Sequence, residues 1–471
     1  MKKRIYTIIF CFTVFITSCE DYLNVQPNGT FIPTTLGHFE SLMIKYDLMQ
    51  ARSSFSMLMM TDLVSADDRF KNATSLFNLR RFVRTDFLDE STSESNQLWD
   101  NIYERIFVYN SIIDEATSKD IEEASEDEVK RLVAMARAAR AYEYFDAVNA
   151  FGKSYNQATA STDLGVPIIT SPNLNAVIPN RHTVQEVYDY MVSEMNEALP
   201  DLPETEYLKT FYPGKDMAYA FLARVYLFMH DYTKAKENAT LALTIKSSIH
   251  DYNNRPFPAI VDNPEVIYLK ERFGWINGIS YASNPIFGGG FSLDSDFSDS
   301  FETGDIRLPI LTRNTRFNDN GEFYIEASER NINVGLSVPE LYLIRAECEA
   351  RLPGGDLQNI LDDLNTVRVF RFATGTYTDL TTSDISDMNE ALSFVLDERK
   401  KELAFRDMRL FDMKRLMVTG DFTETLTRSL FGRDFPMAPN ANNWVINIPL
   451  NVMDFNPDWE QNQRDNVSLG M

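Results

Sequence analysis

An alanine-rich stretch, RLVAMARAARAYEYFDAVNAFG (131–152), constrains the fold of this chain more than any other feature. Its larger apolar side chains recur at steps of three and four residues, which places them on one face of an amphipathic helix. The positions on that face are Leu132, Met135, Ala139, Tyr142 and Phe145. Because alanine adds little bulk, such a helix packs closely against its neighbours, so the sequence predicts a fold built from packed helices.

A second stretch, AYAFLARVYLFMHDYTKAKENATLAL (218–243), predicts two helices joined by a short turn. Its offsets match the small and large positions of a tetratricopeptide repeat, which is a helix–turn–helix unit. The matching positions are Leu222, Ala223, Tyr226, Ala235 and Ala242. The match is imperfect, because Ala239 stands where this repeat usually carries an aromatic residue.

A third unit spans residues 339–368, with Ala346 in the small position of its first helix. Its turn, 353–355, is two residues longer than the standard repeat turn. Further helices are expected at 36–50, 97–117, 183–198 and 389–418. Stacked repeats bury faces that no single helical hairpin can bury alone, and the uneven spacing here rules out a regular solenoid.

Residues 251–335 differ from the helical units, because they are rich in Asn, Gly, Asp and Ser and show little helical period. A long irregular stretch inside a compact domain is usually either functional or disordered. Aromatic residues argue against disorder here. They are Phe273, Trp275, Tyr281, Phe287, Phe291 and Phe297. The sequence therefore predicts a loop-rich insertion.

The first residues predict export. A basic start (2–4) precedes an apolar run (5–16). That run is shorter than the roughly 20 residues that span a bilayer, and it fits the apolar part of a secretory signal. Small residues then precede Cys19, as in the lipobox of bacterial lipoproteins, where the chain is cut before an acylated cysteine. A signal anchor with an incidental cysteine is the alternative.

Charge and cysteine content exclude several classes of function. The chain has 45 Lys and Arg against 69 Asp and Glu, a formal net charge of −24, so nucleic-acid binding through a basic patch is not expected. The three cysteines are Cys11, Cys19 and Cys348. Since the first two belong to the signal and its lipid site, no disulfide within the mature chain is expected. The histidines lack ligand spacing, so neither a metal nor another cofactor is predicted. They are His38, His182, His230 and His250.

Several motifs, taken in their order, resemble the SusD/RagB family of outer-membrane lipoproteins of Bacteroidetes over nearly the whole chain. They are CEDYLNVQPNG, LWDNIYERIFVYNSII, ARAARAYEYFDAVNAFG followed by LGVPII, YLIRAECEARL, LNTVR, ERKKELAFRDMRLFDMKRL and INIPLNVMDFNPDWEQN. One departure lies at 406–408, RDM, where the family usually has an acidic residue and glycine.

The resemblance implies an all-α, tetratricopeptide-like (SusD-like) fold and a non-enzymatic role in nutrient uptake. Such proteins capture a glycan, or in some relatives a peptide, and pass it to a SusC-like TonB-dependent transporter. It also implies an outer-membrane lipoprotein anchored through palmitate at Cys19 and facing the extracellular side. The expected organisation is a signal peptide (1–18), a tether (19–30) and one domain (31–471) with the insertion at about 251–335.

Two other classes stay open on the residues alone, a surface glycoside hydrolase and a repeat-based protein-interaction adaptor. A hydrolase needs one protonated carboxyl and one ionised partner, and no such pair can be identified. The charged residues around 398–415 are better explained as a structural ion-pair network that ties the C-terminal helix to the repeats. They are Glu398, Arg399, Glu402, Arg409, Asp412 and Arg415.

The predicted ligand contacts are Trp275, Asn277 and Tyr281, in the insertion. An indole stacks on the apolar face of a sugar ring, while amide and hydroxyl groups bind its hydroxyls. The alternative is that Trp275 anchors a buried loop. Trp99, Trp444 and Trp459 are expected to be structural.

Two further stretches of the insertion receive structural interpretations. Glycines 288–290 lack the Lys and Ser or Thr of a phosphate loop, so they indicate flexibility. The acidic stretch 294–305 lacks calcium-loop spacing and is expected to be a solvated turn.

Overall fold

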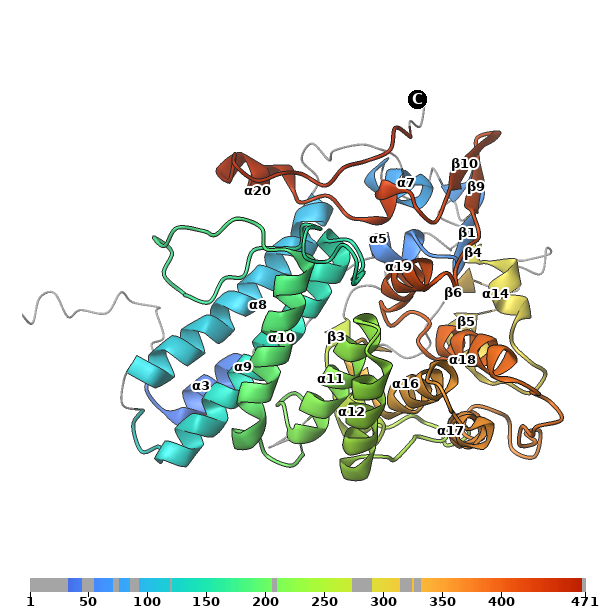
Figure 1. Ribbon diagram of the computed structural model, residues 1–471, viewed down its shortest axis with the longest axis horizontal. Coiled ribbons are helices and arrows are strands. Elements are labelled where there is room, and N and C mark those ends of the chain that lie inside the picture. Colours follow the sequence, from blue (N-terminus) through green and yellow to red (C-terminus); the bar gives the residue numbers. More distant parts are fainter. Residues whose placement is uncertain are drawn as a thin grey trace, which may run out of the picture.

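The computed structural model describes residues 33–44, 55–70, 76–84, 93–118, 121–205, 210–272, 290–313, 324–325 and 332–467. Its long helices are α8 (Ser93–Ser118), α9 (Glu126–Phe151), α10 (Val184–Ala198), α11 (Lys215–Phe228), α12 (Tyr232–Ile245), α16 (Val338–Arg351), α17 (Leu357–Arg368) and α18 (Met388–Glu402). Each packs against the next in this order, from α8 in cyan to α18 in orange (Figure 1). The predicted all-α, repeat-based fold is confirmed.

Local signals in the sequence start these helices. At α9, the Ser125 side chain accepts a hydrogen bond from the backbone of Glu128, whose carboxylate accepts one from the Ser125 N–H at 2.8 Å. Thr183 and Glu186 cap α10 in the same reciprocal way. These capping boxes satisfy backbone N–H groups that have no partner inside a helix. The starts of α9 and α10 are therefore specified by their own residues.

The main core lies between α8–α12 and α16. The five predicted face positions of α9 are all buried, and the Phe145 ring lies 4.9 Å from that of Phe228 in α11, centroid to centroid. Ala235, Ala239 and Ala242 of α12 are also fully buried. Small side chains at these positions let α11 and α12 approach closely. The tetratricopeptide-like interpretation of this unit is confirmed by its helix–turn–helix form.

The elements of a second core, rich in phenylalanine, lie at the upper right in the view of Figure 1, above α16–α18. It involves α5 (Phe55–Met59), α7 (Leu76–Val83), β1 (Val64–Ala66), β4 (Phe291–Leu293), α14 (Ser295–Asp299), β9 (Leu426–Leu430) and β10 (Arg433–Met437). Within it, Phe70 stacks on Phe291 with ring centroids 5.1 Å apart. A third, smaller core joins α16, α17 and α18. The insertion thus supplies Phe291, Leu293 and Phe297 to the second core, which it shares with segments before and after the repeats.

The strands are short and form antiparallel pairs. Val64 pairs with Leu293 in β1–β4, and Arg433 with Leu430 in the hairpin β9–β10. The other pairs join β2 (Val266–Tyr268) to β8 (Leu336–Ser337), β3 (Glu271–Arg272) to β7 (Ile332–Asn333), and β5 (Thr312–Arg313) to β6 (Tyr324–Ile325). A Cβ on Gly335 would lie 1.9 Å from the Tyr268 carbonyl oxygen, so only glycine permits this approach of β8 to β2.

The remaining helical elements are α3 (Leu36–Met43), α15 (Arg307–Leu311), α19 (Arg409–Thr419), α20 (Leu450–Phe455) and the 3₁₀ turns η1 (Leu199–Asp201), η2 (Ile260–Asp262) and η4 (Asn442–Trp444). The predicted helix 36–50 is therefore too long, because α3 ends at Met43, with the Ile44 N–H donating to the Leu42 carbonyl. The predictions 97–117 and 183–198 correspond to α8 and α10.

The predicted single helix 389–418 is wrong, because it is two helices, α18 and α19, separated by residues 403–408. We call this segment the 403–408 turn. Phe405 and Asp407 both adopt a left-handed backbone with φ of 62°, which no helix accommodates. The helical period continues across the turn, which is why the sequence pattern concealed it.

The expectation of a solvated acidic turn at 294–305 is wrong in part. Asp294 caps α14, and Phe297 within the stretch is buried. Asp305 is buried too and pairs with Arg307 at 2.6 Å. Apolar and basic partners from other elements bury this stretch, and local composition does not reveal them.

Lys414 connects α19 to the C-terminal end of α9. Its ammonium is buried and donates hydrogen bonds to the carbonyls of Asn149 (2.6 Å) and Gly152 (2.8 Å). These carbonyls lie at the C-terminal end of α9, where a helix lacks internal donors and carries partial negative charge. Burial lowers the pKa of Lys414 to about 7. The side chain therefore acts as a cap supplied from another helix.

Candidate functional site

Four residues predicted to act in anchoring or binding lie outside the described residues. They are Cys19, Trp275, Asn277 and Tyr281. The description stops at Arg272 in β3 and resumes at Gly290 before β4. Lipidation at the first and ligand contact at the other three remain predictions.

The other tryptophans are buried. Trp99 stacks on Tyr103 with ring centroids 4.5 Å apart and lies 6.3 Å from the Trp459 ring. The indole N–H of Trp444 donates to the Ala438 carbonyl at 2.9 Å. None of the three presents an open ring face to a ligand, as expected for structural residues.

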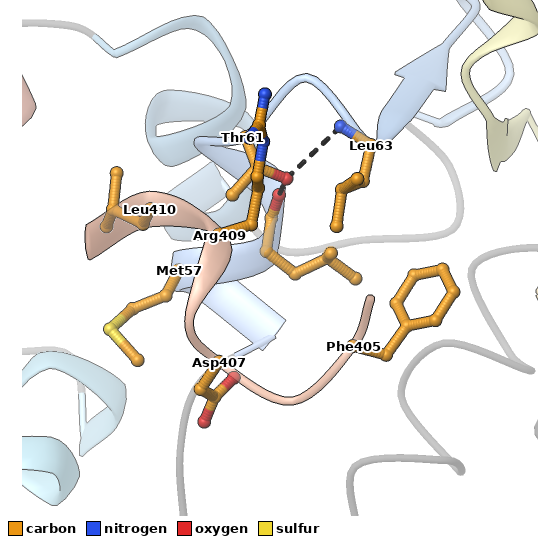
Figure 2. A pocket seen from close by; sticks show the side chains of 8 residues that line it. Met57, Thr61, Leu63, Phe405, Asp407, Arg409 and Leu410 are labelled. Carbon is orange, nitrogen blue, oxygen red and sulfur yellow. Dashed lines mark hydrogen bonds between the residues drawn. The ribbon is translucent and has the colours of Figure 1, made fainter. Parts of the chain in front are cut away.

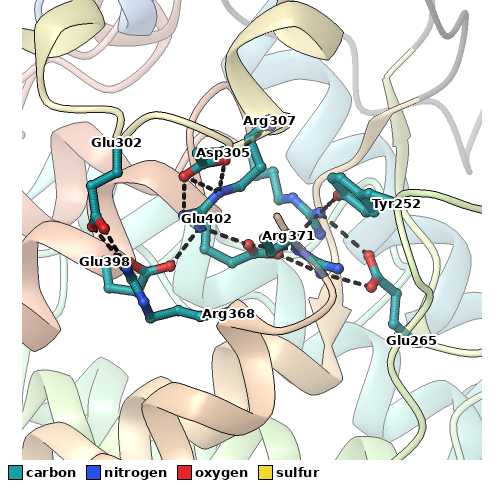
Figure 3. Close-up of polar contacts among 10 residues, drawn as sticks. Tyr252, Glu265, Glu302, Asp305, Arg307, Arg368, Arg371, Glu398 and Glu402 are labelled. Atoms are coloured by element: carbon teal, nitrogen blue, oxygen red, sulfur yellow. Dashed lines mark hydrogen bonds and ion pairs between the residues drawn. The ribbon is translucent and has the colours of Figure 1, made fainter. Parts of the chain in front are cut away.

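The carboxylates of α18 lie in a buried network of arginines (Figure 3). Glu398 contacts Arg307 at 2.7 Å and Arg368 at 2.6 Å. Glu402 contacts Arg371 at 2.8 Å and Arg307 at 3.2 Å. Because Arg368 ends α17 and Arg307 starts α15, the network connects α18 to both elements. We call this set the Glu402 network.

Further groups complete the Glu402 network, as Figure 3 shows. Arg371 also pairs with Glu265 at 2.8 Å, and its guanidinium lies 3.9 Å from the centre of the Tyr252 ring. Arg368 also pairs with Glu302 at 2.7 Å. Each arginine thus meets at least two acidic partners.

The remaining predicted charges pair as well, but not all with one another. Arg399 contacts Asp412 at 2.9 Å and Glu340 of α16 at 3.2 Å. Arg409 pairs instead with Asp62, which follows α5, at 2.7 Å. Arg415 contacts Asp412 at 2.9 Å and Glu347 of α16 at 2.6 Å. These pairs connect α18 and α19 to the repeats.

The Glu402 network lacks the chemistry of a glycosidase. Burial alone would raise the pKa of Glu398, but Arg307 and Arg368 lower it to about 2. The pKa of Glu402 is likewise lowered by Arg371 against the effect of burial. Glycoside hydrolysis needs a carboxyl that stays protonated near neutral pH. Neither of these carboxyls does so.

Two recesses lie on either side of Asp407 in the 403–408 turn. The first, the Arg409 recess, is shown in Figure 2. It is lined by Met57, Leu58, Thr61, Leu63, Phe405, Asp407, Arg409 and Leu410. Its hydroxyl and guanidinium are already used, because Thr61 donates to the Leu58 carbonyl at 2.7 Å and Arg409 pairs with Asp62. Its volume of about 10 Å³ barely admits one water.

The second recess lies between α8, α9 and the 403–408 turn, and we call it the Asp146 recess. It is lined by Met57, Leu98, Ile102, Arg105, Asp146, Ala150, Val334, Arg406, Asp407, Met408 and Phe411. Only Asp146, Arg406 and Asp407 of this lining keep contact with solvent, so the opening is polar and the floor apolar. Its volume of about 20 Å³ admits a group the size of a water molecule.

Asp146 differs from every carboxylate of the Glu402 network. Neighbouring Glu143 takes the nearby cations, since it contacts Arg105 at 2.7 Å and Lys270 at 2.6 Å. Asp146 has no hydrogen bond to any residue that the structure describes. Burial and the charge of Glu143 raise the pKa of Asp146 to about 6.

The sequence did not single out Asp146, because the alanine-rich pattern of α9 predicts helix packing and gives no sign of a binding group. One signal was present: Asp146 stands four residues after buried Tyr142, on the same side of the helix. The arrangement suits binding rather than metal ligation. No group of three or more potential metal ligands occurs within the described ranges.

Comparison with known proteins identifies the family. Residues 21–227 match the model described as "Starch-binding associating with outer membrane", and residues 336–467 match the model "SusD family". The chain is 22% identical to SusD-like protein P2 of Formosa agariphila, over 88% of this chain and 91% of that protein. SusD-like protein P38 of the same organism is 25% identical, over 57% of this chain and 52% of its own length.

Solved structures share the fold. A SusD superfamily protein of Bacteroides thetaiotaomicron superposes with a TM-score of 0.73 at 21% identity, covering 91% of this chain and all of that one. A SusD-like carbohydrate binding protein of Bacteroides vulgatus gives 0.67 at 20% identity, covering 90% and 97%. This chain belongs to the SusD/RagB family. Within the part described, no helix is both long and apolar enough to cross a membrane.

Proposed function

We propose that this protein is a lipid-anchored, cell-surface nutrient-binding protein that captures a glycan and delivers it to a SusC-like TonB-dependent transporter. One observation carries the proposal: two SusD models match successive parts of the chain, and one of them is described as starch-binding and outer-membrane associated. A peptide is the alternative ligand. Anchoring and orientation rest on Cys19 and the apolar run before it.

The hydrolase and adaptor alternatives have weaker support. Asp146, whose pKa is raised to about 6, opens onto a recess that admits only a water-sized group. A glycosidic bond with a carboxyl on each side needs far more room. A protein-interaction adaptor does not need a small-ligand subsite. The polar opening of the Asp146 recess therefore does not support an adaptor role.

The anchor is tested by labelling cells with radioactive palmitate and separating their membranes. We expect the wild-type protein to carry the label, to enter the outer-membrane fraction and to be digested by protease added to intact cells. Cys19→Ala abolishes labelling and releases or stalls the protein. Cys348→Ala is the matched control, because that buried cysteine is far from the signal in the sequence. Palmitate on the Cys19→Ala protein would contradict the proposal.

The partner and ligand are tested on detergent-solubilised outer membranes. A large TonB-dependent transporter should co-purify with the protein, and calorimetric titration should show binding of at least one oligosaccharide. Trp275→Ala should raise that dissociation constant several-fold, since losing one stacking ring removes about 1 kcal/mol. Recovery of the protein alone, with no saccharide bound, would overturn the proposal. A large loss of thermal stability in Trp275→Ala would instead identify a buried loop anchor.

A further inference from the structure

The Asp146 recess contains two polar side chains, Asp146 and Arg406, that make few or no close hydrogen bonds to other described residues. Asp146 makes no hydrogen bond within the described chain. Arg406 makes only long contacts, 3.4 Å to the Tyr252 hydroxyl and 3.6 Å to Glu265. Both side chains are partly exposed, so the fold leaves their bonding capacity to whatever occupies the opening of this one recess.

The charges of the lining cancel. Arg105 and Arg406 contribute two positive charges to the lining, and Asp146 and Asp407 contribute two negative charges. Behind the lining, Glu143 pairs with both Arg105 (2.7 Å) and Lys270 (2.6 Å), and the added charges of Glu143 and Lys270 cancel each other. A charged ligand group of either sign would add a net charge to a lining that has none. A neutral group that both donates and accepts hydrogen bonds matches it. Carboxylates accept from such a group and guanidinium groups donate to it, and a hydroxyl is the smallest group of this kind.

The volume limits what enters. About 20 Å³ admits one water-sized group, so a hydroxyl or the end of a hydroxymethyl arm fits and a sugar ring does not. The apolar floor, which includes Ile102 and Phe411, lies against the carbon of such an arm.

We propose that the Asp146 recess is a subsite that receives one hydroxyl or hydroxymethyl group of a neutral saccharide. Asp146 accepts a hydrogen bond from the sugar, and Arg406 donates one to it. This inference rests on the proposed function and adds a ligand class, a neutral sugar, and the residues that select it. The remainder of the saccharide lies outside the recess.

The left-handed turn positions two of these groups. Asp407, with φ of 62°, lines both the Asp146 recess and the Arg409 recess, and Arg406 precedes it. A helical backbone at these residues would continue α18 and displace both side chains. Left-handed backbone at residues other than glycine is uncommon and is often retained at ligand sites.

The test is calorimetric titration of the full-length protein with three sets of probes. The neutral set is maltoheptaose, xylohexaose, mannohexaose and laminarihexaose; the anionic set is oligogalacturonate; the cationic set is a chitosan hexamer. We expect binding of a neutral probe. Asp146→Asn should raise its dissociation constant about tenfold, while the exposed carboxylate variant Asp114→Asn leaves it unchanged. Thermal unfolding at pH 7 should show that Asp146→Asn folds at least as stably as wild type.

A second variant protects the test against a folding defect. Arg406→Gln removes the charged donor that the proposal assigns to the sugar while keeping an extended polar side chain, and it should also weaken binding. Wild-type affinity in both variants overturns the inference, because the recess then holds only water, while the proposed function stands. Binding of charged probes alone overturns the neutral-sugar assignment. Absence of binding to every probe overturns the proposed function together with the inference.

Discussion

The Glu402 network and the Asp146 recess contain the same kinds of side chain in opposite states. In the network, Glu398 and Glu402 each contact two arginines, and both have a lowered pKa. In the recess, Asp146 has no hydrogen bond within the described chain, and its pKa is raised. The network carboxylates are buried and have partners supplied by the fold, whereas the partly exposed Asp146 carboxylate has no hydrogen-bond partner within the described chain.

The two regions should therefore respond differently to substitution: the Glu402 network contributes to stability, whereas we assign the Asp146 recess to binding. A buried ion pair adds little net stability compared with apolar residues, but removing one member leaves an unpaired buried charge, which is costly. The network is therefore sensitive to any single substitution. The charge on Asp146 is already unpaired, so its removal should relieve the fold. Stability measurements can test this contrast without knowing the ligand.

The largest effect is expected for Glu402→Gln in the network. The substitution leaves Arg371 and Arg307 buried with fewer acidic partners, so we expect the free energy of unfolding to fall by about 3–5 kcal/mol. Urea denaturation at pH 7 measures it. Asp397→Asn, an exposed neighbour on α18, is the control and should lie within about 0.5 kcal/mol of wild type. Equal losses in both variants would contradict a structural network.

The next effect concerns the cap on α9. Lys414→Met keeps the bulk of the side chain but leaves the Asn149 and Gly152 carbonyls without their donor. We expect a loss of about 2 kcal/mol at pH 7. The folded pKa is about 7 and the unfolded value about 10.5, so the unfolded state binds more protons between them. Wild-type stability therefore rises with pH in this window, and its advantage over Lys414→Met should be larger at pH 9 than at pH 7.

The helical array could be predicted from sequence because its signals are local. The period of α9, its capping box at Ser125 and the alanines of α12 each lie within a few turns. The same explanation holds for α10 and for the unit α16–α17. Helices that bury one face reveal that face in their own residues.

The break at the 403–408 turn and the Asp146 recess could not be predicted in this way. Phe405 and Asp407 are left-handed without a glycine to indicate it. The recess brings Asp146 together with Arg105, Val334 and Arg406, which come from distant parts of the chain. Only tertiary packing brings them together, so no local pattern records the site. The predicted contacts Trp275, Asn277 and Tyr281 stay untested predictions.

A smaller effect of opposite sign is expected for Asp146→Asn. The charged groups that act on this carboxylate are Glu143 on its own helix, Arg105 on α8, Arg224 on α11 and Lys270 after β2. The folded pKa of about 6 exceeds the unfolded value of 3.8, so the folded state binds more protons between these values. Wild-type stability therefore falls as pH rises through this window.

Asp146→Asn should match wild type near pH 4 and exceed it by about 1–2 kcal/mol above pH 6.5. Thermal unfolding across pH 4–8 measures this difference, and Asp114→Asn should show none of it. A destabilised Asp146→Asn protein at pH 7 would mean that the fold does satisfy this carboxylate. The contrast with the Glu402 network would then disappear.

The smallest effect compares two left-handed positions next to α19. Gly420 ends that helix with φ of 81°, and a Cβ there would meet no atom within 4 Å, so Gly420→Ala introduces backbone strain without a clash. We expect it to lower the free energy of unfolding by about 1 kcal/mol. Asp407→Gly removes strain of the same kind, offset in part by the greater freedom of glycine in the unfolded chain, so a gain of at most about 0.5 kcal/mol is expected. Thermal unfolding of both variants against wild type measures these effects. An Asp407→Gly protein that lost as much stability as Gly420→Ala would show that the Asp407 side chain stabilises the turn. Its carboxylate would then have a structural role, like the charges of the Glu402 network, and not a binding role in the recess.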